Sequence, residues 1–69
     1  MATVRLITAM LRDIPPYDAP APVRAEWFQR KAEAFDAIAT EDRHLAAEAA
    51  QLAEGARIQA ERLRRGWSA

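Results

Sequence analysis

Four prolines lie within eight residues, at Pro15, Pro16, Pro20 and Pro22, and they divide this chain of 69 residues into two unequal parts. Proline lacks the backbone N–H that helices and central strands need, and it forces the preceding residue out of the α-helical region. No regular element can therefore run through residues 15–22. We expect an extended, polyproline-like connector here, between a short N-terminal element and a longer C-terminal one.

Residues 3–14 have the hydrophobic periodicity of an amphipathic helix. At about 100° per residue, the apolar side chains share one side and the polar ones face the other. The alternation typical of a strand fails at the adjacent apolar pairs Leu6–Ile7 and Met10–Leu11. We predict a short helix over 3–14, with Thr3 as its N-cap and Pro15 at its end.

The rest of the chain predicts a pair of helices. One covers residues 22–39 and starts at Pro22, and the other covers residues 42–65 and stops at Gly66. No glycine or proline separates them, and a heptad register runs through the break, so one helix of about 45 residues is the alternative. Asp42 favours a helical hairpin, because an aspartate destabilises an apolar seam but stabilises a helix as its N-cap.

The composition indicates a small core. Alanine contributes 17 residues to the 51% of the chain that is hydrophobic, and alanine favours helix while filling little core volume. A core in a chain of this size supplies only about 3–5 kcal/mol, so such chains often rely on disulfides, metals or oligomerisation. Because the chain has no cysteine, disulfides are excluded. We expect an all-α fold, either a three-helix bundle or a dimeric helical bundle with coiled-coil character.

The heptad seam is the candidate site for self-association. It combines aromatic residues, leucines and a single lysine. That lysine either acts as a polar selector at the seam or packs its stem and extends its ammonium group into water. We predict that a second copy of the chain, and in addition another protein, binds an interface made of Trp27, Phe28, Lys31, Phe35, Ile38, Leu45, Leu52 and Leu63.

Residue types that carry catalysis are scarce in this chain. His44 is the only histidine, and neither a cysteine nor a glycine-rich phosphate loop accompanies it. Glu41 and His44 match the Glu-x-x-His pair of di-iron helical bundles, but the pattern offers no further carboxylates on the inner face. We expect no enzymatic activity, no cofactor and no metal site, with a metal-binding bundle as an alternative.

Charge and hydropathy narrow the classes of partner. Ten basic and ten acidic residues balance to a net charge of zero, without the basic surplus typical of nucleic-acid binders. No apolar run reaches the about 18 residues that would span a bilayer, and the first residues do not resemble a signal peptide. We expect a cytoplasmic, non-enzymatic interaction or regulatory module. The alternative is a small DNA-associated regulator that uses Arg5, Arg12 or the Arg62–Trp67 tail, if Trp67 does not pack on the helices.

Overall fold

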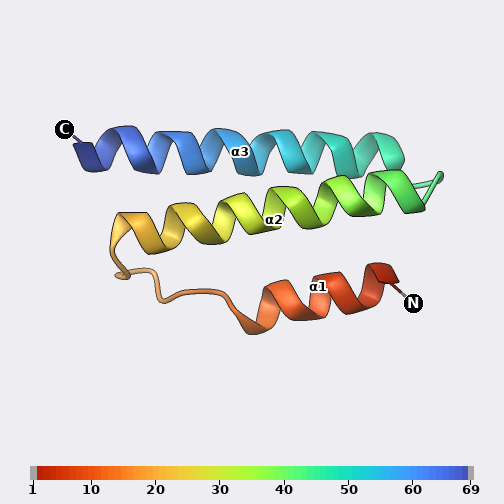
Figure 1. Ribbon diagram of the computed structural model, residues 1–69, viewed down its shortest axis with the longest axis horizontal. Coiled ribbons are helices and arrows are strands. Elements are labelled where there is room, and N and C mark those ends of the chain that lie inside the picture. Colours follow the sequence, from red (N-terminus) through yellow and green to blue (C-terminus); the bar gives the residue numbers. More distant parts are fainter. Residues whose placement is uncertain (1, 69) are drawn as a thin grey trace.

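The computed structural model describes residues 2–68, with the side chains of residues 3–66, and it confirms the all-α fold. The described residues form three helices, α1 (Ala2–Arg12), α2 (Ala21–Glu41) and α3 (Ala46–Ser68). Helix α2 lies in the middle, with α1 along one side and α3 along the other (Figure 1). Helices α2 and α3 form an antiparallel hairpin, which is the alternative that Asp42 favoured, and not one continuous helix.

Helix α1 ends before the prolines, as expected, but its first turn differs from the prediction. The helix begins at Ala2, so Thr3 lies inside it and does not act as its N-cap. The end is closed by the N–H of Asp13, which donates to the carbonyl oxygens of Ala9 at 3.3 Å and Met10 at 3.2 Å. The residue before Pro15 is non-helical, as proline requires.

The connector covers residues 13–20, two residues earlier than the predicted 15–22, and it is less extended than predicted. The N–H of Ala19 donates to the carbonyl oxygen of Pro16 at 3.0 Å and closes a turn. The carbonyl oxygen of Pro20 then accepts the first backbone hydrogen bonds of α2, at 3.0 and 3.1 Å. Pro22 lies in the first turn of α2, where its missing N–H would have had no acceptor within the helix.

Asp42 makes the turn between α2 and α3. Its backbone is extended (φ −117°, ψ 103°), although its N–H still donates to the carbonyl oxygen of Ile38 at 2.8 Å. Its carboxylate Oδ1 accepts the backbone N–H groups of His44 at 3.0 Å and Leu45 at 3.3 Å. The N–H of Leu45 also donates to the carbonyl oxygen of Asp42 at 3.2 Å, so the carboxylate and the backbone of Asp42 together cap the amides that precede α3. Because residues 43–45 form this turn, α3 begins at Ala46, later than the expected residue 42.

Alanine forms most of the contact between α2 and α3. Among the described side chains, all the buried ones are alanines except Ile38, which is 2% exposed. Small side chains at a helix–helix contact allow the two helix axes to approach closely. Phe28 and Phe35 pack against the edge of this contact. We call it the alanine seam, and it consists of Ala25 and Ala32 on α2 and Ala49, Ala53, Ala56 and Ala60 on α3.

The leucines predicted for this contact lie beside it. Leu45 and Leu52 are 38% and 50% exposed, whereas Ala49, which lies between them on the same side of α3, is buried. The contact line is rotated around α3 toward Ala53 and Ala60, which are fully buried. This rotation is favourable because alanine lets α2 and α3 come closer than leucine would. The leucines therefore flank the alanine seam and do not fill it.

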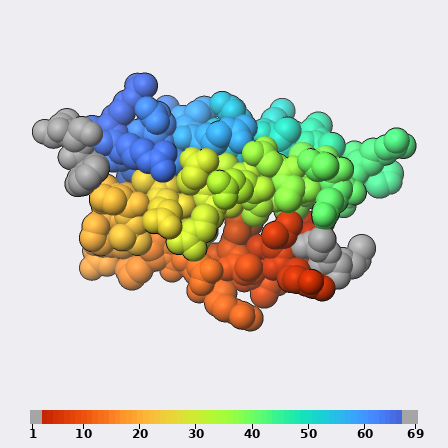
Figure 2. All heavy atoms as spheres, in the orientation of Figure 1, coloured from red at the N-terminus to blue at the C-terminus, as the bar shows by residue number. Residues whose placement is uncertain are grey.

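The three helices form one layer with α2 in the middle and not a closed triangle. Within the described residues, no Cα atom of α1 comes within 8 Å of one in α3. The space-filling view shows the same order, with α2 between its two neighbours (Figure 2). The radius of gyration is 12.6 Å, against about 11 Å for a compact chain of this length. Since domains normally bury their apolar surface between two packed layers, a single layer leaves apolar surface uncovered.

Candidate interaction surface

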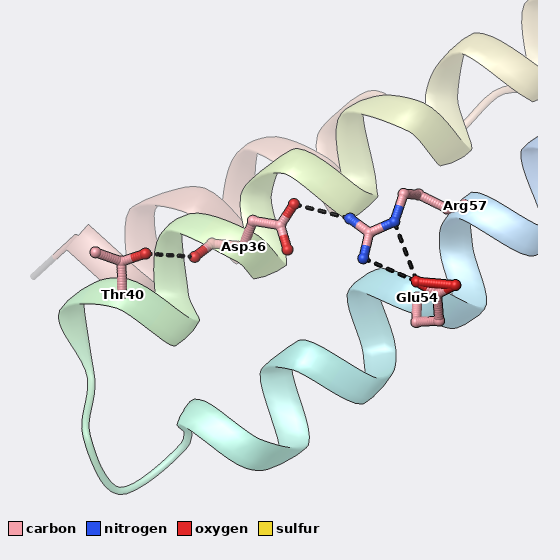
Figure 3. A network of polar contacts seen from close by, with 4 residues as sticks. All are labelled: Asp36, Thr40, Glu54 and Arg57. Carbon is pink, nitrogen blue, oxygen red and sulfur yellow. Dashed lines mark hydrogen bonds and ion pairs between the residues drawn. The ribbon is translucent and has the colours of Figure 1, made fainter.

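Ion pairs cover one face of the layer. Arg57 of α3 donates to Asp36 of α2 at 2.9 Å and to Glu54 at 3.0 Å (Figure 3). Arg30 donates to Glu26 at 3.1 Å. The hydrogen bond to Glu54, together with Asp36, raises the pKa of Arg57, so its guanidinium remains charged. We call this surface, made of these five residues, the ion-pair face. Exposed pairs of this kind contribute little to stability, so this face is a solvated surface.

Large apolar side chains gather on the opposite face. At about 100° per residue, Phe28 and Phe35 lie about 160° and 180° around α2 from Glu26 of the ion-pair face, so they point away from it. A groove of about 190 Å³ lies on this side, with Phe35 and Ile38 of α2 between Ile7 of α1 and Leu52 of α3. Further apolar side chains of α1 and α3 extend the surface beyond the groove. We call it the apolar face, and it consists of Val4, Ile7, Leu11, Phe28, Phe35, Leu45, Leu52 and Leu63.

Three charged side chains border the apolar face. Lys31 is half-buried, and its Nζ lies 5.3 Å from the centroid of the Trp27 ring and 5.7 Å from that of Phe28. Arg24 is half-buried two turns earlier on α2, and Glu48 lines the groove from α3. Among the described residues, none of these three charged groups takes part in an ion pair. They are therefore available to a partner that carries complementary charges.

Most of the predicted interface residues lie on or beside the apolar face. Phe28, Phe35 and the three leucines belong to it, and Lys31 borders it. Ile38 lies at the bottom of the groove and is buried within the chain, so it has a core position. Whether these residues bind a partner stays a prediction.

Trp27 lies between α2 and α1. Its Nε1–H donates to the carbonyl oxygen of Met10 at 3.2 Å, and its ring stands edge-on to Phe28 with 5.0 Å between centroids. It also lines a second groove, of about 330 Å³, between α1 and α2 on the side of Arg30 and Glu33. Trp27 therefore acts first as the attachment point of α1.

The structure adds α1 to the surface predicted from the seam. Ile7 is 38% exposed and Leu11 is 63% exposed, so α2 covers only part of the apolar side of α1. The periodicity of residues 3–14 already indicated an apolar side. How much of that side α2 leaves open depends on the docking of α1, which periodicity does not determine.

The Glu-x-x-His motif requires both residues to lie in one helix, but Glu41 and His44 do not. Glu41 is the last residue of α2, and His44 lies in the turn that follows. In the part of the chain that the structure describes, no three histidine, aspartate or glutamate side chains gather where they could hold a metal ion.

The arginines considered for nucleic-acid binding lie apart from one another. Arg5 and Arg12 are exposed on α1, and the Arg62–Trp67 tail continues α3 on the far side of α2. Gly66 does not end α3, which runs on to Ser68 without a positive φ angle at any described glycine. The predicted packing of the Trp67 side chain lies outside the described side chains.

Comparisons with protein-family models, with curated proteins and with solved structures find no match to this chain. Among the described helices, none is both long and apolar enough to cross a membrane. A function must therefore be inferred from the residues of the chain and their arrangement.

Proposed function

We propose that this chain is a non-enzymatic helical interaction module that binds protein chains, including a copy of itself, through the apolar face. One observation carries the proposal: three amphipathic helices form a single layer whose fully buried side chains are almost all alanine, while most of its larger apolar side chains are exposed or only half-buried. A partner that lies on the apolar face would provide the missing second layer. Each apolar Å² that it covers would contribute about 25 cal/mol.

The distribution of side chains supports binding at this face and not at the other. On the ion-pair face, charged groups already pair with one another, as Arg57 does with Asp36 and Glu54, and Arg30 and Glu33 border the groove that opens there beside Trp27. The apolar face instead presents leucines and aromatic rings around a groove, with Lys31 held over two of the rings. Contiguous apolar surface with a charged border is typical of protein-binding sites, and aromatic residues are enriched in them.

Solution mass, measured by light scattering behind a sizing column at several concentrations, tests the proposal. Leu52 and Ile58 provide a matched pair, because both lie on α3 and are 50% and 44% exposed. Leu52 lines the groove of the apolar face, whereas Ile58 lies beside Glu61 and Arg62 on the outer side of α3. We expect a concentration-dependent dimer that Leu52→Gln shifts to monomer and Ile58→Gln leaves unchanged.

Two outcomes contradict self-association through this face. One is a wild-type chain that remains monomeric at every concentration. The other is a dimer that both substitutions weaken to the same extent, because the contact would then not distinguish the apolar face from the outer side of α3.

A further inference from the structure

The surface area of the chain suits a partner as large as the chain itself. The accessible surface is 5143 Å², which is about 800 Å² more than a compact monomer of 7.7 kDa exposes. Each partner in a protein–protein interface of standard size loses about 800 Å². A second copy covering the apolar face would therefore remove the excess, whereas a single short helix in the groove would cover only part of it.

Charges of opposite sign lie on either side of the centre of the apolar face. Phe35 lies six residues before the end of α2, and Leu52 lies six residues after the start of α3, so the antiparallel hairpin places both at one level. Ile7 of α1 lies there too, in the same groove. Lys31 precedes Phe35 by about one turn, and Glu48 precedes Leu52 by the same interval, so they lie about 6 Å from this level in opposite directions.

Two symmetric arrangements bring one apolar face onto another. If the twofold axis is parallel to the helices, the end of the apolar face that carries Lys31 lies over the same end of the partner's apolar face. If the twofold axis crosses the helices, the partner runs in the opposite direction, and the end of the apolar face that carries Lys31 lies over the end of the partner's apolar face that carries Glu48. Like charges opposed in an interface cost affinity, and opposite charges specify register, so the charges favour the second arrangement.

We propose that the occupant of the apolar face is a second copy of this chain, antiparallel to the first, about a twofold axis that crosses the helices at the level of Phe35 and Leu52. Lys31 of each protomer then lies at the level of the partner's Glu48, on the neighbouring helix one interhelical spacing of about 8–10 Å to the side, and the two Phe35 rings lie near the axis. This inference rests on the proposed function and adds to it the identity and the orientation of the partner.

A charge-reversal series tests the orientation by sedimentation at low salt. Lys31→Glu alone and Glu48→Lys alone each place like charges across the interface, and we expect each to weaken the dimer about tenfold. The double variant Lys31→Glu/Glu48→Lys restores opposite charges and is expected to recover the affinity to within about threefold. A double variant as weak as the two single changes combined would overturn the antiparallel pairing, and so would a series without any effect.

Disulfide trapping gives a second readout that does not depend on charge. The chain has no cysteine, so one substitution creates a single thiol in each protomer. Across the proposed axis, Leu52→Cys meets its own copy and is expected to form a covalent dimer under mild oxidation, since disulfides need Cα atoms within about 7 Å. Ile58→Cys, on the outer side of α3, is the control and is expected to remain reduced.

The outcomes separate this inference from the proposed function. A dimer that Leu52→Gln dissociates, but that shows no charge rescue and no trapping at residue 52, keeps the apolar face as the interface and overturns the orientation. Trapping at residue 58 as fast as at residue 52 also overturns it. A wild-type chain that is monomeric at every concentration overturns the second copy as the occupant together with the self-association that the proposed function includes.

Discussion

The indole Nε1–H of Trp27 donates to the carbonyl oxygen of Met10 at 3.2 Å, and this hydrogen bond joins the middle helix to the last turn of α1. The same carbonyl oxygen also accepts the N–H of Asp13, which closes the end of α1. One acceptor thus serves both the local end of a helix and its attachment to the rest of the chain. Because, within the described residues, Cα atoms of α1 come within 8 Å of α2 but not of α3, this bond has a large influence on where α1 lies.

Trp27→Phe should loosen α1. The ring contact is largely kept, but the hydrogen bond is lost and a small void is left, which together cost about 1–2 kcal/mol. The free energy of unfolding, measured by urea titration at fixed protein concentration, should fall by this amount, and amide exchange should accelerate most in α1. Tyr17→Phe is the control, because Tyr17 is 91% exposed and should show neither change. Equal acceleration in all three helices would contradict a specific role in docking α1.

Ala53→Leu should destabilise the hairpin. Ala53 is fully buried in the alanine seam, so the larger side chain must push α2 and α3 apart. Overpacking of this kind costs about 1–3 kcal/mol. Ala50→Leu is the matched control, because Ala50 is exposed on the same helix. Urea unfolding followed by circular dichroism measures both, and similar midpoints for the two variants would show that the seam tolerates larger residues.

Asp42→Ala should weaken the turn between α2 and α3. The carboxylate accepts two backbone N–H groups, those of His44 and Leu45, and loss of such a cap costs about 0.5–2 kcal/mol. Asp42→Asn should retain most of the stability, because asparagine caps nearly as well. Thermal unfolding of both variants against the wild-type chain checks this order. An Asn variant as unstable as the Ala variant would indicate that charge matters here and not the acceptor.

Gly55→Ala should stabilise the chain. Gly55 lies in the interior of α3, and an added Cβ would meet no atom within 4 Å. Replacing an exposed helical glycine by alanine stabilises a protein by about 0.5–1 kcal/mol. Gly66→Ala, close to the end of α3 and equally free of clashes, should stabilise less because helix ends fray. A rise in the melting temperature for Gly55→Ala, with a smaller one for Gly66→Ala, is the expected result.

The candidate interaction surface was predictable only in part. Phe28, Phe35 and Leu52 are found from the heptad register, because a repeat of apolar residues identifies one side of a helix. Ile38 belongs to the same register, yet it is buried against the chain itself. Ile7 was found as an apolar residue of the first helix but not as part of this surface. Periodicity identifies a side of a helix and leaves open which neighbour covers it.

The sequence by itself determined the elements of this protein. Prolines end one helix and start the next, and Asp42 turns the chain back, because these effects act on the backbone within a few residues. Tertiary structure alone decided which side of each helix is covered. Alanines and not leucines occupy the contact between α2 and α3, because two helices approach most closely where their side chains are smallest. That choice moved Leu45 and Leu52 to the flank and left an apolar face on a single layer.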